Sequence, residues 1–154
     1  MPYGFWQLHS VCSWAGCVEP LRQVPREHWS DEEGSNVPGL REVLDLLLAG
    51  DGGDAITEPL AELAARTWAT PFGERVSKPI AALHLALRTR DATAFQAAIL
   101  GVVDGHLYMV RGPMKLDSDA FLILGLLGPL RAAVRSGLPF QLDTPYFPLE
   151  LVHD

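Results

Sequence analysis

Two histidines lie in apolar stripes of predicted helices, where an imidazole could act as a general base or bind a ligand. His84 shares a helix face with Ile80 and Leu87, and His106 continues the stripe that contains Val102. Imidazole changes its charge near neutral pH, which suits it to proton transfer. A histidine in such a stripe is more often a core residue that is bonded to a carbonyl or a carboxylate. If the two helices are neighbours, the pair would instead line a small-molecule pocket.

Other signs of catalysis or of a bound cofactor are weak in this sequence. The five histidines and two cysteines lack the spacing of a metal site, with no H-E-x-x-H motif and no paired C-x-x-C. The chain also lacks the G-x-S-x-G nucleophile motif, a P-loop and a dinucleotide fingerprint. We therefore predict no catalytic residue, no metal and no cofactor. A non-catalytic role is favoured, although helical enzymes can assemble sites from scattered residues.

The charge of the chain is uneven, and this bears on its partners. The net charge is −7 over 154 residues, and residues 1–57 alone hold nine acids against three arginines. Residues 58–137 are slightly basic, with nine basic and seven acidic residues. Nucleic acid is excluded as a direct ligand, because phosphate binding needs a positive surface. An acidic first third suits either solubility or attraction to a basic protein partner.

One acidic stretch also contains an aromatic residue. The polar connection over residues 25–37 holds Glu27, Trp29, Asp31, Glu32 and Glu33. An aromatic anchor inside a charged rim is typical of protein interfaces, where the aromatic side chain holds the complex and the rim speeds encounter. These five residues are the predicted partner-binding site. The alternative is a solvated loop.

Helical periodicity dominates the chain and predicts an all-α fold, a compact bundle of helical hairpins. One or two short helices are expected between Tyr3 and Arg22, followed by a helix from near Pro38 to Gly50. Further helices are expected to begin at caps and to end in glycine, proline or polar breaks. The predicted caps are Thr57, Ser77, Asp91 and Ser118. The last of these helices, closed by Gly137, is apolar on all sides, so it should be central and kinked at Pro129.

The C-terminal segment is apolar, and its prolines disfavour both helix and strand. Residues 138–154 contain three prolines and four large apolar side chains, Phe140, Tyr146, Phe147 and Leu149. We expect an extended strap that lies in a groove between the last helices of its own domain. An exposed docking strip for a partner is the alternative. The expected organisation is one domain over 1–154, with an acidic N-terminal part (1–57), a helical core (58–137) and the strap (138–154).

Two further features bear on location and redox state. No secretory signal precedes the first aromatic residues, and the apolar run 120–130 is too short to cross a bilayer. A cytoplasmic protein without membrane attachment is therefore expected. Cys12 and Cys17 would lie roughly 140° apart on a helix, which disfavours a local disulfide and indicates buried free thiols.

The second half of the chain resembles a known family. "ALHLALRTRD-ATAFQAAI" and "GHLY", followed by "SDAFLILGLLGPLRAAVRSGLPFQLDTPYFPLELV", is similar to the C-terminal half of the Immunity protein 49 family of bacterial polymorphic-toxin systems. The similarity covers about residues 78–151, and the Tyr146-Phe147-Pro148 ending carries most of it. It implies a helical antitoxin that binds and blocks a cognate toxin without catalysis. Tyr146 and Pro148 would have a structural role.

Two classes of function therefore follow from the sequence. The first is an immunity protein whose partner is a protein toxin, expected to be basic because residues 1–57 are acidic. The alternative is a small helical enzyme or ligand-binding protein with a pocket between the His84 and His106 helices.

Overall fold

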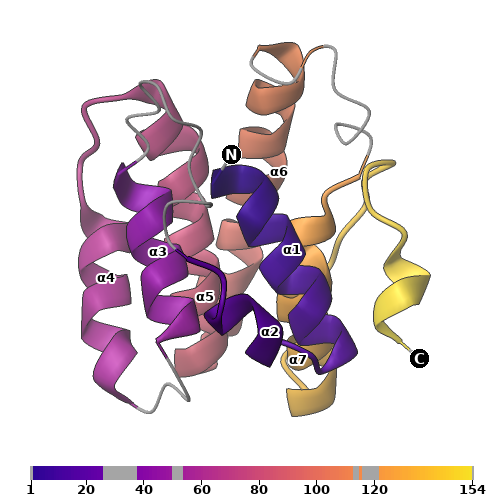
Figure 1. Cartoon of the computed structure of the whole chain (residues 1–154). Helices are drawn as coiled ribbons and strands as arrows, with labels where there is room; N and C mark the ends of the chain where they lie inside the picture. Colours follow the sequence, from indigo (N-terminus) through magenta and orange to yellow (C-terminus); the bar gives the residue numbers. More distant parts are fainter. Residues whose placement is uncertain (1, 26–37, 50–53, 113–114, 116–121, 154) are drawn as a thin grey trace.

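The regular structure is helical throughout the described part of the chain. The computed structural model describes residues 2–25, 38–49, 54–112, 115 and 122–153. Within these residues there is no β-strand, and short 3₁₀ and π turns join the α-helices (Figure 1). The all-α prediction is confirmed. The α-helices are α1 (Pro2–Ala15), α2 (Glu19–Arg22), α3 (Pro38–Leu48), α4 (Thr57–Ala65), α5 (Lys78–Thr89), α6 (Ala92–Arg111) and α7 (Leu127–Ser136).

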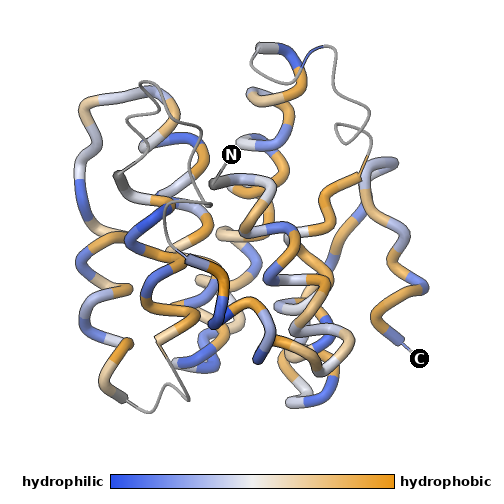
Figure 2. The backbone as a smooth tube through the Cα atoms, viewed as in Figure 1, coloured by the Kyte–Doolittle hydropathy of each residue, from blue (hydrophilic) through white to orange (hydrophobic). Residues whose placement is uncertain are grey.

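Helices α5 and α6 form a hairpin with a two-residue connection. Arg90 ends α5 in the left-handed conformation, with φ 57°. Asp91 then caps α6, because its carboxylate accepts a hydrogen bond from the N–H of Ala94 at 2.9 Å. The predicted cap at Asp91 is confirmed. Helices α4 and α5 also pair, and hydrophobic and hydrophilic residues alternate along α3 and α4 (Figure 2), as expected for helices that bury one face.

Helix α5 is the central helix of the bundle. It packs against α4 and α6 and also contacts α3 and α7. Its buried residues are Ile80, Ala81, Leu83, His84 and Ala86. The prediction that the last helix is central is wrong, because Ala132 and Arg135 of α7 are exposed.

Helix α7 is shorter than predicted, and Pro129 lies near its start rather than in its interior. It begins at Leu127 after a 3₁₀ turn, Leu124–Leu126, and Ile123 is not helical; Ser118 lies outside the described residues. Pro129 is thus in the first turn, where its missing N–H would have no intrahelical partner anyway. Gly137 ends the helix at φ 70°, as predicted.

Two other predicted caps do not act as caps. Thr57 is the first residue of α4 rather than its cap, and the side chain of Ser77, at the cap of α5, makes no capping bond. Helix α4 starts after Ile56, the last residue of a 3₁₀ turn, and α5 continues directly from a π turn over Gly73–Ser77. Trp68 lies beyond the end of α4. Gly39 and Gly73 let the backbones of α3 and the π turn approach its ring.

The two cysteines lie closer together than a continuous helix would place them. Helix α1 ends at Ala15, and Gly16, at φ +74°, turns the chain back so that Cys17 donates its N–H to the carbonyl of Cys12 at 2.8 Å. Both thiols are free, but Cys12 is only half-buried and Cys17 is exposed, so the expectation of two buried thiols is wrong. Burial and the neighbouring Cys17 thiol raise the pKa of Cys12.

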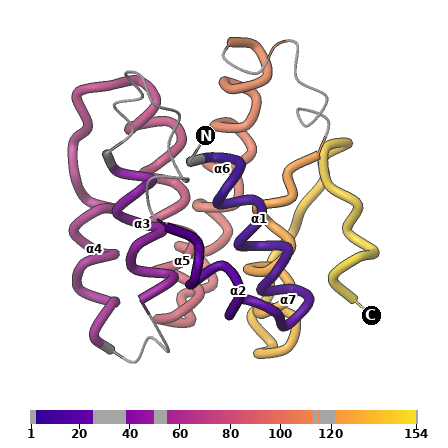
Figure 3. Tube along the Cα trace, viewed as in Figure 1, coloured from indigo at the N-terminus to yellow at the C-terminus, as the bar shows by residue number. Residues whose placement is uncertain are grey.

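The C-terminal strap packs on its own bundle, as predicted. It leaves α7, runs back along the molecule and ends beside α1 (Figure 3), where the indole N–H of Trp14 donates to the carbonyl of Leu151 at 2.9 Å. The ring of Phe140 meets Phe95 of α6 edge-on, with centroids 6.1 Å apart. The carbonyl of Tyr146 accepts a hydrogen bond from Ile123 at 2.8 Å. The buried residues of the strap are Leu138, Phe147 and Val152.

Helix α6 is apolar because one side of it packs inside the bundle. By length and composition it could cross a membrane. However, its buried residues face α5, the π turn and the strap, as in the core helix of a globular protein. These buried residues are Phe95, Ala98, Ile99, Val102, Gly105, His106 and Met109.

Candidate functional site

The predicted partner-binding residues cannot be placed on the fold. Glu27, Trp29, Asp31, Glu32 and Glu33 lie outside the described residues, in the segment 26–37 between α2 and α3. Their role stays a prediction.

His84 is a buried hydrogen-bond acceptor. The indole N–H of Trp6 donates to Nε2 of His84, with 3.2 Å between the nitrogens. Burial lowers the pKa of His84 from 6.5 to about 3, and the nearby His9 and Arg88 act in the same direction. The ring is therefore neutral at pH 7, as its acceptor role requires.

His106 is also buried and joins α6 to α1. Its Nδ1 lies 2.8 Å from the hydroxyl of Tyr3, and its ring centroid is 5.6 Å from that of Tyr146 in the strap. Burial raises the pKa of the Tyr3 hydroxyl, so this hydroxyl stays protonated near neutral pH.

The two histidines bond to neighbouring turns of α1. Tyr3 and Trp6 are themselves almost completely buried, and their rings lie 5.6 Å apart. Large aromatic side chains therefore contact both imidazoles, which leaves little space beside the histidines for a small molecule. The groove described below is lined by neither histidine. The arrangement is that of core histidines, with the phenol of Tyr3 and the indole of Trp6 among their partners.

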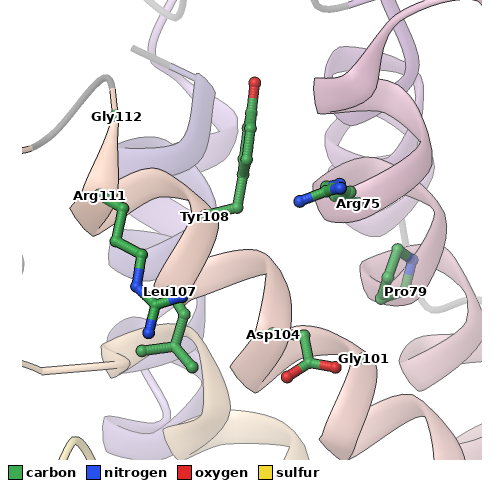
Figure 4. Close-up of a pocket in the computed structure, with 8 residues that line it drawn as sticks. All are labelled: Arg75, Pro79, Gly101, Asp104, Leu107, Tyr108, Arg111 and Gly112. Atoms are coloured by element: carbon green, nitrogen blue, oxygen red, sulfur yellow. The ribbon is translucent and has the colours of Figure 1, made fainter.

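The candidate site is a groove on another face of α6. It lies between the π turn Gly73–Ser77, the start of α5 and the second half of α6, with a volume of about 580 Å³ (Figure 4). The lining includes Arg75, Pro79, Gly101, Asp104, Tyr108 and Arg111.

Two glycines of α6 let the opposite wall of the groove, formed by the π turn and the start of α5, approach the helix closely. A Cβ at Gly105 would overlap the carbonyl oxygen of Arg75, and a Cβ at Gly101 would lie 3.0 Å from Pro79. The residues are four apart and so share one helix face. Any larger side chain at position 105 would push the π turn, and Arg75 with it, away from α6. π-Helical turns are often found at functional sites.

The groove is basic in an acidic protein. The guanidinium carbon of Arg75 lies 5.4 Å from the centroid of the Tyr108 ring, a cation–π contact. Arg111 is in the last turn of α6, and Tyr108 stands between the two arginines (Figure 4). Both arginines are exposed, and among the described residues neither pairs with a carboxylate. Asp104, also exposed, is the acidic residue of the lining.

The sequence contains a signal for this groove apart from its apolar stripes. Asp104, Tyr108 and Arg111 recur at i, i+4 and i+7, so they form a second face of the helix that carries His106. The spacing of Gly101 and Gly105 indicates a close neighbour on that side. Arg75 could not be assigned to the groove from sequence, because its position depends on how the π turn packs.

The side chains of this groove suit the recognition of a ligand. Among its described lining residues, no nucleophile stands beside a base. In the described part of the chain, no three histidine, cysteine or acidic side chains come together as ligands for a metal ion. Its exposed guanidinium groups instead suit the binding of an oxyanion such as a carboxylate.

Comparison with known proteins relates the chain to one family. The model of Immunity protein 49 matches residues 12–151, nearly the whole chain. The match extends well beyond the C-terminal half to which the sequence resemblance was confined. No curated protein and no solved structure matches the chain.

Proposed function

The chain belongs to the Immunity protein 49 family, and we propose that it binds and blocks a cognate protein toxin without catalysing a reaction. The family match over residues 12–151 carries this proposal. The basic groove is consistent with it, because that groove has groups for recognition and no catalytic pair. A cytoplasmic location is part of the proposal. The small-molecule alternative has less support, since Tyr3 and Trp6 fill the space beside the histidines.

Complex formation with a toxin is the direct test. The candidate toxin is to be sought in the neighbouring gene, where a multidomain toxin would be the partner, and its toxic domain is produced alone. We expect the two proteins to co-elute in size-exclusion chromatography and co-expression to restore growth of cells that make the toxin. A catalytically inactive toxin variant serves as the binding partner where the active domain kills the host. Full toxicity in the presence of excess immunity protein, with no complex, would contradict the proposal.

We propose the acidic connection around Trp29 as one part of the binding face. In support, a single aromatic residue lies among Glu27, Asp31, Glu32 and Glu33, as in an anchor with a charged rim. Trp29→Ala is expected to raise the dissociation rate of the toxin complex at least tenfold, a loss of about 1.4 kcal/mol. Surface-immobilised kinetics measure this rate directly.

Neutralising the three acidic residues at positions 31–33 tests the charged rim separately from the aromatic anchor. Their change to amides should slow association rather than speed dissociation, mostly at low salt, because steering by charge is screened at high ionic strength. Unchanged rates in both variants would place the binding face elsewhere on the protein.

A further inference from the structure

Arg75 and Arg111 are two cationic side chains with no anionic partner in the described part of the fold. The ion pairs there join Arg22 to Glu19, Arg66 to Glu42 and Lys78 to Glu74. Neither groove arginine takes part, although acidic residues outnumber basic ones in the chain by 19 to 12.

The fold holds Arg75 in place from two sides. Its backbone lies against Gly105 of α6, and its guanidinium lies over Tyr108, one turn further along the same helix. A side chain fixed in this way loses less freedom when it binds a ligand than an extended surface arginine would. Tyr and Arg are also the residues most enriched among those that dominate binding energy at protein interfaces.

We propose that this groove receives a carboxylate side chain of the toxin. This inference rests on the proposed function and names a second contact of opposite sign to the acidic connection. A guanidinium donates two parallel N–H bonds to a carboxylate, and the Tyr108 ring supports the Arg75 guanidinium from one side. Asp104 would repel a second acid but would accept a hydrogen bond from an N–H group. The preferred ligand is therefore one acidic residue of the toxin with a hydrogen-bond donor beside it.

Two contacts of opposite sign would also orient the toxin. A basic patch on the toxin would face the acidic connection, and an acidic residue would enter the groove. A toxin with only one of these features would pair poorly, since unmatched charges at an interface carry a penalty. This arrangement would let the immunity protein distinguish its own toxin from related ones.

The test compares neutral variants of the groove with a matched variant elsewhere. Arg75→Gln and Arg111→Gln remove one positive charge each, and Arg135→Gln makes the same change on the exposed face of α7. We expect each groove variant to weaken toxin binding at least tenfold, and more at low salt than at high salt. Arg135→Gln should stay within twofold of wild type. Thermal melts of all three variants check that the fold is retained.

The outcomes separate the groove from the function itself. If the wild-type protein fails to bind the toxin, the proposed function is wrong. If the wild type binds and both folded groove variants bind equally well, the function stands and the groove assignment is overturned. Rescue of Arg75→Glu by a toxin variant with one surface acid changed to lysine would identify the occupant. Loss of affinity for inorganic phosphate alone, with toxin binding unchanged, would make the groove a small-anion site and would also overturn the assignment.

Discussion

Phe147→Ala is expected to reduce the free energy of unfolding by about 3–5 kcal/mol, the usual cost of truncating a buried phenylalanine. Phe147 is only 5% exposed, although it lies in a segment without regular structure for most of its length. Deletion of residues 138–154 should be more damaging, because it also removes Leu138 and Val152 and uncovers the rings of Phe95 and His106. We expect the truncated protein to melt at a lower temperature and to aggregate.

Leu151 provides a matched control in the same strap. Its side chain is 38% exposed, so Leu151→Ala removes an apolar group of comparable kind without opening a cavity, and the stability should change by less than about 1 kcal/mol. Chemical denaturation followed by tryptophan fluorescence measures all three variants. Equal stability of Phe147→Ala and Leu151→Ala would mean that the strap does not belong to the core.

Local sequence signals predicted much of the fold. A proline at the start of α3, the Asp91 carboxylate at the start of α6 and Gly137 at the end of α7 all act within one or two turns. The strap was predictable because its prolines exclude helix while its side chains are too apolar for solvent. Such features do not depend on distant parts of the chain.

The errors arose where distant residues decide the local structure. The 3₁₀ turn before α7 lies against Trp6, and a Cβ at Gly125 would overlap the ring of that tryptophan. This contact joins residues more than a hundred positions apart, so the hydrophobic pattern of residues 118–137 could not reveal it. Likewise, the sequence placed His84 and His106 on suitable faces but could not show that Tyr3 and Trp6 contact them. The groove was missed because Arg75 and Tyr108 meet only through tertiary packing.

Wild-type stability is expected to fall as the pH is lowered below 6.5, and His84 should cause a measurable part of this loss. Burial lowers the pKa of His84 to about 3 in the folded protein, against 6.5 when unfolded. The folded state therefore favours the neutral ring. Its contribution is fully present above pH 6.5 and is lost as the pH falls toward 3. Each pH unit in this window costs about 1.4 kcal/mol, or about 2 kcal/mol between pH 6.5 and pH 5.

His9 contributes to the same acid sensitivity. Burial and the charge of Arg22 lower its pKa to about 4, so its contribution is also lost as the pH falls from 6.5 toward 4. Because both histidines disfavour protonation in the fold, a single substitution should remove only part of the pH dependence.

The variant His84→Gln isolates the contribution of His84 to the pH dependence of stability. The amide oxygen can still accept the Trp6 indole N–H, but the side chain cannot be protonated. The slope of the free energy of unfolding against pH should therefore be smaller in this variant, by the equivalent of about one bound proton. Urea unfolding at intervals between pH 7.5 and pH 5 avoids most carboxylate titration and gives both slopes. His153→Gln, at an exposed position, should keep the wild-type slope. Parallel pH profiles for wild type and His84→Gln would show that His84 accepts its proton equally well in both states, which its burial beside Trp6 forbids.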